Sequence, residues 1–409
     1  MKTAWQTRRL AEVCPTIQDG AHESPKRQFD APGDGRFLYI TSKNIRMNNL
    51  NLGDVSYVER DFHDRIYPRC QPRVGDVLLT KDGASTGNVT LNTLDEEFSL
   101  LSSVCLIKTD PAALYPAFLC YYLQSPDGLR GIVGRMTGAA IKRIILQNVK
   151  LATIPLPPLE EQRRIIGMLD EAFKAIASAR ANAEQNLRNA QAVFESRISA
   201  TFSQREERSG SWELRSLGDL FDITSSKRVF EADWRREGVP FYRAREIVKL
   251  ARDGFVNNEL FISEEMYDRY SAKHGIPTTG DIMVTGVGTL GICYVVKATD
   301  RFYFKDGNII WLKKISDVES RFVAYAFRSE FLRKQIDDSV GATVGTYTII
   351  KAKGTVIPVP PLPEQERIVE HLDRVAVETR HLASVYRRKL DALDGLKQSL
   401  LHQAFSGAL

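Results

Sequence analysis

Two long stretches of the chain place apolar residues at the spacing of an α-helix. In the later stretch they recur at steps of three and four positions, interrupted at Thr379 and Lys389: Ile368, Leu372, Val375, Leu382, Tyr386, Leu393, Leu396 and Leu400. In the earlier stretch the equivalent positions hold Ile165, Leu169, Ala172, Ile176, Ala179, Ala183, Ala190 and Val193. No proline or glycine lies between Met168 and Ser209. We therefore predict two uninterrupted helices of about 40 residues each, at about 162–202 and 365–405.

These stripes also predict how the two helices are used. Their spacing is close to a heptad repeat, and the alanine-rich first stripe allows a close approach, so we expect a coiled-coil pair. The alternative is that each helix packs only on its own globular domain. Because four turns of helix suffice for that purpose, the length of these helices favours the coiled coil.

The segments that open the two helices are nearly identical. IPLPPLEEQRRIIGMLD at 154–170 and IPVPPLPEQERIVEHLD at 357–373 share eleven of seventeen positions at an offset of 203. Weaker matches precede them, such as WQTRRL at 5–10 with WELRSL at 212–217, and Ile45 with Ile247. The offset varies early in each half and then stays at 203 from residue 138 to residue 202. The chain is therefore a tandem repeat whose helical part tolerates no change of length.

The rest of each half has the pattern of a globular domain with strands and helices. Short apolar runs precede glycine turns, as in VGDVLLT at 74–80 and TGDIMVT at 279–285, and helical patterns follow at 112–125 and 320–336. We therefore predict an α+β fold, with two α/β domains in tandem repeat separated by two long helices. The expected boundaries are 1–153 and 208–356 for the globular domains, and 154–207 and 357–409 for the helical segments.

Composition narrows the class of protein without identifying it. The chain has 409 residues, 26% of them charged, and a net charge of +5, which permits a polyanionic partner without requiring one. Its five cysteines have no metal-ligand spacing and are odd in number, which is typical of a reducing compartment. No apolar run approaches the length of a membrane span, so we expect a cytoplasmic protein.

One motif resembles an enzyme site and is better explained otherwise. Gly286 to Gly291 fits G-x-G-x-x-G after a predicted strand, but the dinucleotide site needs a helix next, and the following residues, 292–297, read as a strand. A strand–turn–strand is the favoured interpretation. The chain shows no P-loop, no nucleophile elbow and no histidine cluster. We therefore predict no catalytic residue, no metal site and no cofactor.

Polar and basic residues recur at matching loops of the two halves. Arg, Lys, Asn, Ser and Thr are the side chains that reach phosphates and base edges, although any single one is more often a solvated loop residue. The predicted nucleic-acid contacts are Lys26, Arg27, Thr41, Lys43, Asn44, Arg46, Lys81, Ser85, Thr86, Asn88, Lys142, Arg143, Lys227, Arg228, Arg243, Arg245, Thr285, Thr289, Thr346, Tyr347 and Lys351.

The doubled I-P-[LV]-P-P-L-x-E-Q-x-R-I-[IV] element, opening a long helix each time, resembles the specificity subunit of type I restriction–modification systems. The G-D-[VI] strands with glycine turns fit the same family, and the resemblance covers the whole chain. It implies that each globular part is a target recognition domain reading one half of an asymmetric bipartite sequence in double-stranded DNA. It also implies that the helices pair antiparallel and hold the two domains apart.

The same resemblance implies partners. The family's subunit has no catalysis of its own. It binds two adenine-methylating modification subunits, which carry S-adenosylmethionine, and ATP-driven restriction subunits complete the endonuclease. The residues expected to bind partners are Pro157, Leu159, Gln162, Ile165, Leu169, Pro360, Leu362, Gln365, Ile368 and Leu372.

Three alternatives stay open at this point. The chain could serve a methylation-only or otherwise different restriction complex. It could be a nucleotide-binding enzyme built on Gly286–Gly291, or a coiled-coil adaptor with no role in DNA binding.

Overall fold

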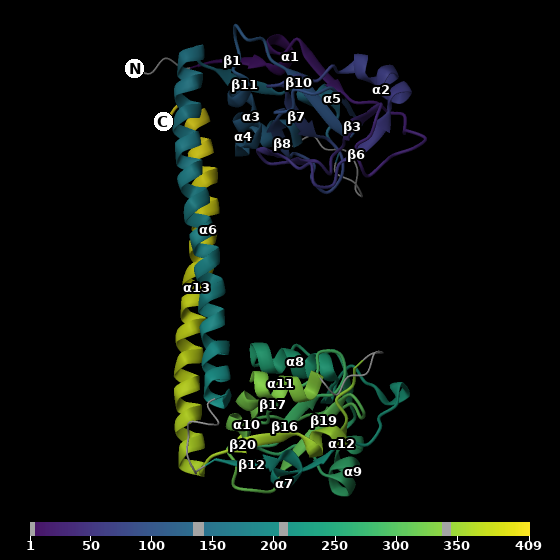
Figure 1. Ribbon diagram of the computed structural model, residues 1–409, viewed down its shortest axis with the longest axis vertical. Helices are drawn as coiled ribbons and strands as arrows, with labels where there is room; N and C mark the ends of the chain where they lie inside the picture. The colour runs from purple at the N-terminus through teal and green to yellow at the C-terminus, as the bar shows by residue number, and fades with distance from the viewer. Residues whose placement is uncertain (1–4, 134–142, 204–211, 338–344) are drawn as a thin grey trace. The chain divides into compact units, whose positions relative to one another are not determined.

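The computed structural model describes residues 5–133, 143–203, 212–337 and 345–409 (Figure 1). It divides into two compact units. The first unit contains Met1–Glu184 and Arg388–Leu409, and the second contains Gln185–Arg387. Helix α6, Leu159–Ser203, begins in the first unit and ends in the second, while α13, Leu362–Ser406, runs from the second into the first. Both predicted long helices are therefore present, each with 45 residues.

A four-stranded antiparallel sheet lies at the centre of the first globular domain. Its strand order is β2 (Thr16–Asp19), β10 (Val104–Lys108), β7 (Val77–Thr80) and β8 (Val89–Leu91). All four residues of β7 are buried, because the sheet is covered on both faces. Val77 and Leu79 pack with helix α3 (Pro116–Gln124) and with α6, and Leu78 packs with the second sheet.

The second sheet has three strands. Strand β3 (Arg36–Ile40) lies between β6 (Ser56–Glu59) and β9 (Phe98–Leu100), antiparallel to the first and parallel to the second. A short hairpin of β4 (Ile45–Arg46) and β5 (Asn49–Leu50) follows β3. Helix α2 (Arg60–Ile66) and the 3-10 turn η1 (Tyr67–Arg69) follow β6.

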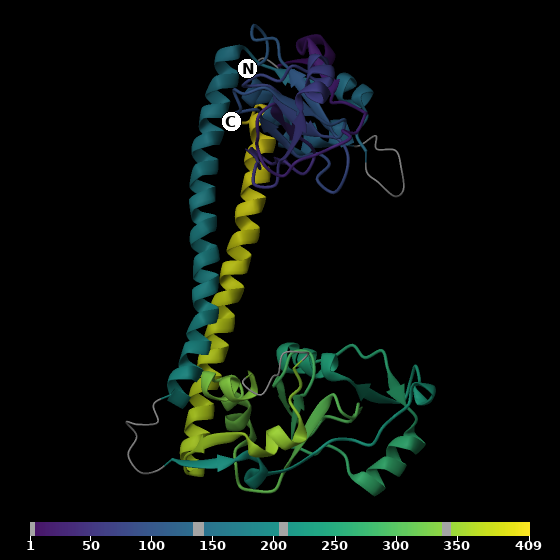
Figure 2. The ribbon, with the colours of Figure 1, turned by 45° about the vertical axis from the view of Figure 1, so that its right-hand side comes forward.

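The helices of the first domain cover the other face of the central sheet. They are α1 (Leu10–Val13), α3 (Pro116–Gln124), α4 (Pro126–Val133) and α5 (Leu146–Leu151). Strand β1 (Gln6–Arg9) pairs antiparallel with β11 (Thr153–Leu156), which leads directly into α6. The core on this face also receives Leu401, Ala404 and Phe405 from the end of α13, which lies against this domain in Figure 2.

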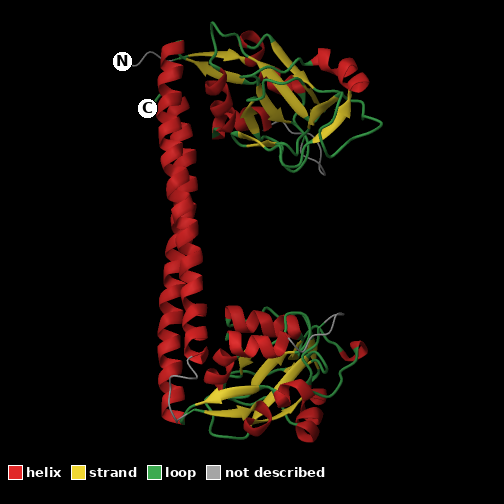
Figure 3. Ribbon diagram, in the orientation of Figure 1, coloured by secondary structure: helices red, strands yellow, loops and turns green. Residues whose placement is uncertain are grey.

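The second globular domain repeats this arrangement (Figure 3). Its central sheet has the order β13 (Phe221–Thr224), β19 (Ile309–Lys314), β16 (Ile282–Thr285) and β17 (Cys293–Val295), and its second sheet β15 (Phe261–Ile262), β14 (Val239–Tyr242) and β18 (Tyr303–Phe304). The remaining elements are β12 (Glu213–Ser216), which pairs with β20 (Val356–Val359), α7 (Leu217–Leu220), η2 (Glu231–Asp233), α9 (Glu264–His274), α10 (Ser320–Ala326), α11 (Glu330–Asp337) and α12 (Ile349–Gly354). The predicted tandem repeat is confirmed, because the four-stranded and three-stranded sheets have equivalent strands in the same order.

The two domains differ after the first strand of the three-stranded sheet. Where the first domain forms the β4–β5 hairpin, the second forms helix α8, Ala244–Asp253. The helix ends at Gly254, whose φ of +78° is the left-handed conformation that glycine adopts at a helix end. Ile45 and Ile247, matched in the sequence repeat, are both fully buried. The two domains thus bury an isoleucine at the same position, although one places it in a hairpin and the other in a helix.

Within each unit the long helices run antiparallel. In the first unit Arg180 of α6 pairs with Asp394 of α13 at 2.5 Å. Arg164, earlier on α6, donates to the backbone oxygen of Leu409, which lies three residues beyond the end of α13. In the second unit Phe194, Ile198 and Phe202 of α6 share a core with residues 368–376 of α13.

The predicted apolar stripes are correct only in part. Val193, Leu382 and Leu396 are exposed by 48%, 44% and 47%, whereas Phe194 and Ala383 are buried next to them. An α-helix drifts by about 20° per heptad relative to a strict seven-residue repeat, so the buried side moves by one position along a helix of this length.

We predict that Phe405→Ala destabilises the first unit by about 3–5 kcal/mol. The Phe405 ring packs edge-on against Phe118 at 5.0 Å and Tyr122 at 5.2 Å between ring centres, and it is 6% exposed. Denaturation of the full chain and amide hydrogen exchange in α3 measure the loss. The control, Leu396→Ala on the same helix, should stay within about 0.5 kcal/mol, and an equal loss there would contradict the role given to Phe405.

Candidate nucleic-acid interface

Three of the predicted contact regions of the first domain meet at one edge of its strands. The Ser85 hydroxyl donates to the backbone oxygen of Ser42 at 3.1 Å, and the Asn88 amide donates to that of Ile45 at 3.2 Å. The backbone N–H of Ile144 donates to the oxygen of Lys81 at 2.9 Å. Residues 41–46, 81–88 and 143–144 therefore lie next to one another at this edge, as a shared contact region requires. Lys142 lies outside the described residues.

The second domain gathers its equivalent loops in the same way. The backbone N–H of Tyr347 donates to the backbone oxygen of Gly286 at 3.0 Å. The backbone N–H of Gly286 donates to the backbone oxygen of Asn308 at 2.9 Å. The Ser226 hydroxyl donates to the oxygen of Phe304 at 2.6 Å. The loops after β13, β16 and β18 thus meet the segment that begins at Gly345.

Four of the predicted contact residues have side chains inside the domains. Asn44, Lys81, Thr285 and Tyr347 are exposed by 0%, 2%, 0% and 2%. Asn44 accepts from the backbone N–H of Thr41 at 2.9 Å, and the Tyr347 and Thr355 hydroxyls bond at 2.8 Å. The expectation that these four side chains lie on the surface is wrong, because each satisfies its polar atoms within its own domain.

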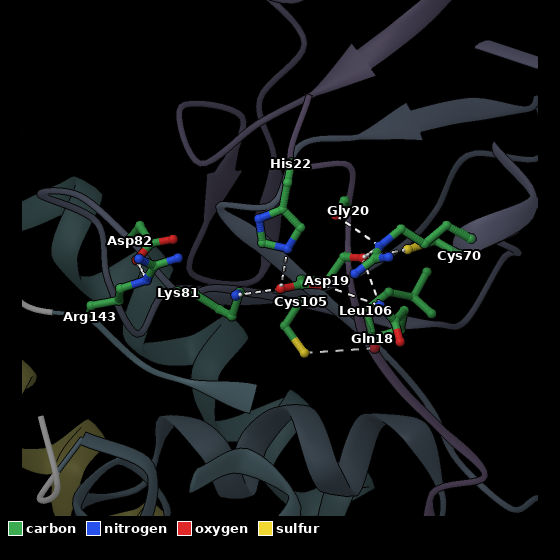
Figure 4. Close-up of polar contacts among 11 residues, drawn as sticks. Gln18, Asp19, Gly20, His22, Cys70, Lys81, Asp82, Cys105, Leu106 and Arg143 are labelled. Carbon is green, nitrogen blue, oxygen red and sulfur yellow. Dashed lines mark hydrogen bonds and ion pairs between the residues drawn. The ribbon is translucent and has the colours of Figure 1, made fainter. Parts of the chain in front are cut away.

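A buried charge cluster holds Lys81 (Figure 4). Its ammonium lies 2.9 Å from Oδ2 of Asp19, Arg69 donates to Oδ1 of Asp19 at 2.7 Å, and Nε2 of His22 lies 3.2 Å from Oδ2. The side chains of Asp19 and Lys81 are exposed by only 5% and 3%. Burial acts to raise the pKa of Asp19, but the hydrogen bonds from Arg69 and Lys81 outweigh it, so the pKa lies below its ordinary value.

Sequence reasoning missed Asp19, Arg69 and His22. The available signal was an aspartate at the end of a short strand whose residues are otherwise apolar or neutral, since a buried carboxylate needs a cationic partner. The partner itself lies 62 residues away, at Lys81. Nothing in the sequence spacing connects the two.

The second domain has no such cluster at the corresponding positions. Asp19 pairs with Cys105 in the sheet, and the residue that follows β13 at this level is Ser225, whose hydroxyl donates to the oxygen of Ile309 at 2.9 Å. The position of Lys81, directly after β7, is taken by Gly286 after β16. A Cβ atom on Gly286 would lie 2.8 Å from the oxygen of Tyr347, so this close approach requires glycine. Strand β17 follows the turn, which confirms the strand–turn–strand interpretation of Gly286–Gly291.

Most of the exposed cations at these edges have acidic partners. Arg143 pairs with Asp82 at 2.9 Å, Lys43 with Asp54 at 3.4 Å, and Arg228 with Asp306 at 3.0 Å. Arg243 and Arg245 both bind Glu246. Within the described part of the chain, Lys26, Arg27, Arg46 and Lys227 have no ion-pair partner. The pair of Lys43 with Asp54 is exposed on both sides, and such pairs contribute about 0–1 kcal/mol, so a phosphate can replace this acid at little cost.

The residues expected to bind partners differ in exposure. Pro157, Gln162, Ile165, Leu169, Pro360, Gln365 and Leu372 are buried within their own units, Leu159 and Ile368 are half-buried, and Leu362 is exposed. For the seven buried residues the expected surface position is wrong, because they attach the long helices to the globular domains.

The repeated glutamine shows this attachment most clearly. Oε1 of Gln162 accepts from the backbone N–H of Tyr115 at 2.8 Å, and its Nε2 donates to the oxygens of Ala113 at 2.9 Å and Pro157 at 2.8 Å. Oε1 of Gln365 accepts from the N–H of Glu319 at 2.9 Å. The same side chain thus makes the same connection in both units.

A family model described as the type I restriction modification DNA specificity domain matches residues 2–186 and 210–383. The chain belongs to this family. The two matches coincide with the two repeats and include most of both globular domains, which confirms the resemblance seen in the doubled element.

Curated relatives agree with this assignment. A putative type I restriction enzyme specificity subunit from Haemophilus influenzae is 26% identical over 75% of this chain and 76% of its own. The StySPI specificity subunit from Salmonella potsdam is 26% identical over 99% of this chain and 89% of its own. The EcoKI specificity subunit from Escherichia coli is 22% identical over 89% and 82%.

Solved structures show the same fold. A chain from a study of complex assembly and conformational transition in the type I R-M system superposes with a TM-score of 0.76, at 19% identity, over 100% of this chain and 99% of its own. The HsdS subunit from Thermoanaerobacter tengcongensis gives a TM-score of 0.60 at 19% identity, over 100% and 98%. Within the described residues, no helix is long and apolar enough to span a membrane, and no group of three metal-binding side chains occurs.

We predict that Asp19→Asn destabilises the first unit by about 3–5 kcal/mol, because it leaves Lys81 buried without an anion. Lys81→Met removes the buried cation together with its need for a partner and should cost less. Urea denaturation of the full chain compares the two, with the exposed Glu96→Gln as control. Because the folded-state pKa of Asp19 is lowered, its contribution is present above about pH 4 and is lost as the pH falls through that lowered value. A loss for Asp19→Asn no larger than the control would contradict the cluster's role.

Proposed function

We propose that the chain is the DNA-binding specificity subunit of a type I restriction–modification complex. Each globular domain reads one half of an asymmetric bipartite sequence in double-stranded DNA. The observation that carries this proposal is that both globular domains have the same sheets but present different loops at the same edge of those sheets. The β4–β5 hairpin stands where the second domain has α8, and Lys81 stands where it has Gly286.

Two similar domains with different edges fit the reading of two different half-sites. A shared sheet keeps the loops in the same place, and the loops supply the donors and acceptors that distinguish base edges. Among the predicted contacts, those with exposed or half-exposed polar groups stay candidates for base or phosphate contact: Lys26, Arg27, Thr41, Lys43, Arg46, Ser85, Thr86, Asn88, Arg143, Lys227, Arg228, Arg243, Arg245, Thr289, Thr346 and Lys351. Arg69 and His22 join this set, because Asp19 orients both and their side chains are 42% and 58% exposed.

In this proposal the chain carries out no chemistry itself. Two modification subunits bind the long helices and supply adenine methylation with their S-adenosylmethionine, and restriction subunits supply ATP-driven cleavage. The complex acts in the cytoplasm. A nucleotide-binding enzyme is disfavoured because the Gly286–Gly291 turn leads into a strand, where the dinucleotide motif needs a helix.

We also propose that the recognition domains extend close to the boundaries expected from sequence, 1–153 and 208–356. Strands β11 and β20 are an exception. The sequence placed most of both strands with the helical segments, but each pairs with the first strand of its globular domain. They form the connection between domain and helix, so an exchange of domains should include them.

Exchanging residues 1–157 for the equivalent segment of a relative tests the division of labour. We expect one half of the methylated sequence to change and the other half and the spacer to stay, because each domain has its own core and its own edge. Sequencing of methylated adenines in a host that carries the complex gives both half-sites. A change in both halves would contradict the modular interpretation.

Arg46→Ala in the first domain should weaken binding of all duplexes nearly equally if Arg46 contacts phosphate. The slope of log K against log salt should then fall by about 0.9, the value for one phosphate contact. If Arg46 reads a base, the loss should be about 1–3 kcal/mol at one position of the target only. Titration of the complex with its modification subunits separates the two. Lys174→Ala, which removes an exposed cation on α6, serves as control. If Arg46→Ala changes neither the salt dependence of binding nor the affinity for any target variant, the DNA surface lies elsewhere.

A further inference from the structure

The repeated seventeen-residue segment fastens each globular domain to its long helix at two points. The first point is the buried glutamine, Gln162 or Gln365. The second is the last residue of the segment, Asp170 or Asp373. The Tyr121 hydroxyl on α3 donates to Oδ1 of Asp170 at 2.5 Å, and the Tyr325 hydroxyl on α10 donates to Oδ1 of Asp373 at 2.5 Å.

The two units reproduce this contact independently. The aspartates stand at an offset of 203 and the tyrosines at an offset of 204, so the contact is kept although the loops before it differ in length. Around it the sequences diverge, since Gly167 and Met168 become Glu370 and His371. The contact is thus kept in both halves although neighbouring residues of the segment have changed.

The distance between the glutamine and the aspartate along the helix determines how strongly the two contacts together restrict the orientation of the domain. Eight residues of helix separate the glutamine from the aspartate, which is about 12 Å at 1.5 Å per residue. Apolar packing around them, such as Phe173 edge-on to Tyr121 at 5.4 Å, is strong but has no preferred direction. A hydrogen bond to a carboxylate is directional, so the pair of points defines the tilt of the domain on the helix.

The tyrosine hydroxyl remains a donor throughout the physiological pH range. Burial, together with the hydrogen bond to Asp373, raises the pKa of Tyr325 to about 12. The same two causes raise the pKa of Tyr121. The contact is therefore permanent and does not act as a pH switch.

We propose that the Tyr121–Asp170 and Tyr325–Asp373 hydrogen bonds are positioning contacts that fix the tilt of each recognition domain and so restrict the spacer lengths that the protein accepts. This inference rests on the proposed function. One ångström of slack over 12 Å is a tilt of about 5°, which moves a point about 30 Å away, roughly one domain diameter, by about 2.5 Å. That displacement approaches the rise of one base pair, about 3.4 Å.

The two units differ in one respect that sharpens the test. Arg321 of α10 also pairs with Asp373, whereas the matching position of α3 is Ala117. Tyr325→Phe therefore leaves Asp373 with a second partner from the same domain, while Tyr121→Phe leaves Asp170 without its hydrogen bond to α3. Tyr121→Phe should accordingly have the larger effect.

The experiment measures methylation of duplexes that carry both half-sites and spacers differing by single base pairs. The full chain is used with its modification subunits, and the half-sites are taken from the methylated sequence of the wild type. For Tyr121→Phe and Asp170→Ala we expect methylation at spacers one base pair too short or too long to rise about tenfold relative to the native spacer, with both half-sites unchanged. Asp170→Asn keeps an acceptor and should restore most of the wild-type profile.

Controls separate positioning from general stability. Glu171→Ala is the neighbouring exposed residue on α6 and should leave the profile unchanged. Tyr121→Phe keeps the half-buried ring and its packing, so this variant still tests the inference if Asp170→Ala fails to fold, a failure that thermal unfolding identifies. An unchanged spacer profile in folded Tyr121→Phe, with normal half-site reading, overturns the inference alone. Absence of sequence-specific methylation in the wild type would instead overturn the proposed function.

Discussion

The burial of the two long helices under the globular domains is the constraint on which the rest of the structure depends. The core of the first unit combines α3, Ile165 and Leu169 of α6, and Leu401 and Phe405 of α13. The core of the second unit combines α10 with Phe194 and Ile198 of α6 and with the first turns of α13. Each helix is thus fastened in both units, and both helices have 45 residues. A residue inserted in only one helix would shift it out of register in one core, which explains why the offset of 203 is constant there and varies elsewhere.

The sequence predicted what depends on local periodicity and on internal repetition. The uninterrupted apolar stripes predicted both helices to within a few residues of their ends, and the matching segments of the two halves predicted the tandem repeat. The exposed side of the helices was predicted less well. Leu382 and Leu396 follow an ideal heptad and yet are exposed, because the helix period of 3.6 residues carries the buried side away from that repeat.

The proximity of the candidate loops was predicted more accurately than the exposure of their side chains. The loops at 41–46 and 81–88 do meet, because neighbouring strands bring them to one edge. Lys81, however, is inside the domain, since Asp19 binds it across 62 residues of chain. Gln162 and Gln365 were expected to bind partners because their segment resembles that of the specificity-subunit family. They are repeated because each domain needs the same attachment to its helix. Recurrence therefore indicates a shared constraint, and only the structure shows whether that constraint is internal or external.

The two domains hold equivalent loops in place by different physical means. In the first domain, the buried Asp19 carboxylate fixes Lys81, and the backbone oxygen of Lys81 in turn accepts from Ile144. In the second domain, Gly286 lets the backbone of Tyr347 approach closely, and no buried charge is needed. A charge cluster tolerates side chains of many shapes above it but requires every partner to be present. A close backbone approach requires glycine at one position and leaves the neighbouring loop residues unconstrained. The loops of the two domains can therefore change in sequence under different constraints. Two domains that share a scaffold and read different half-sites require such a difference.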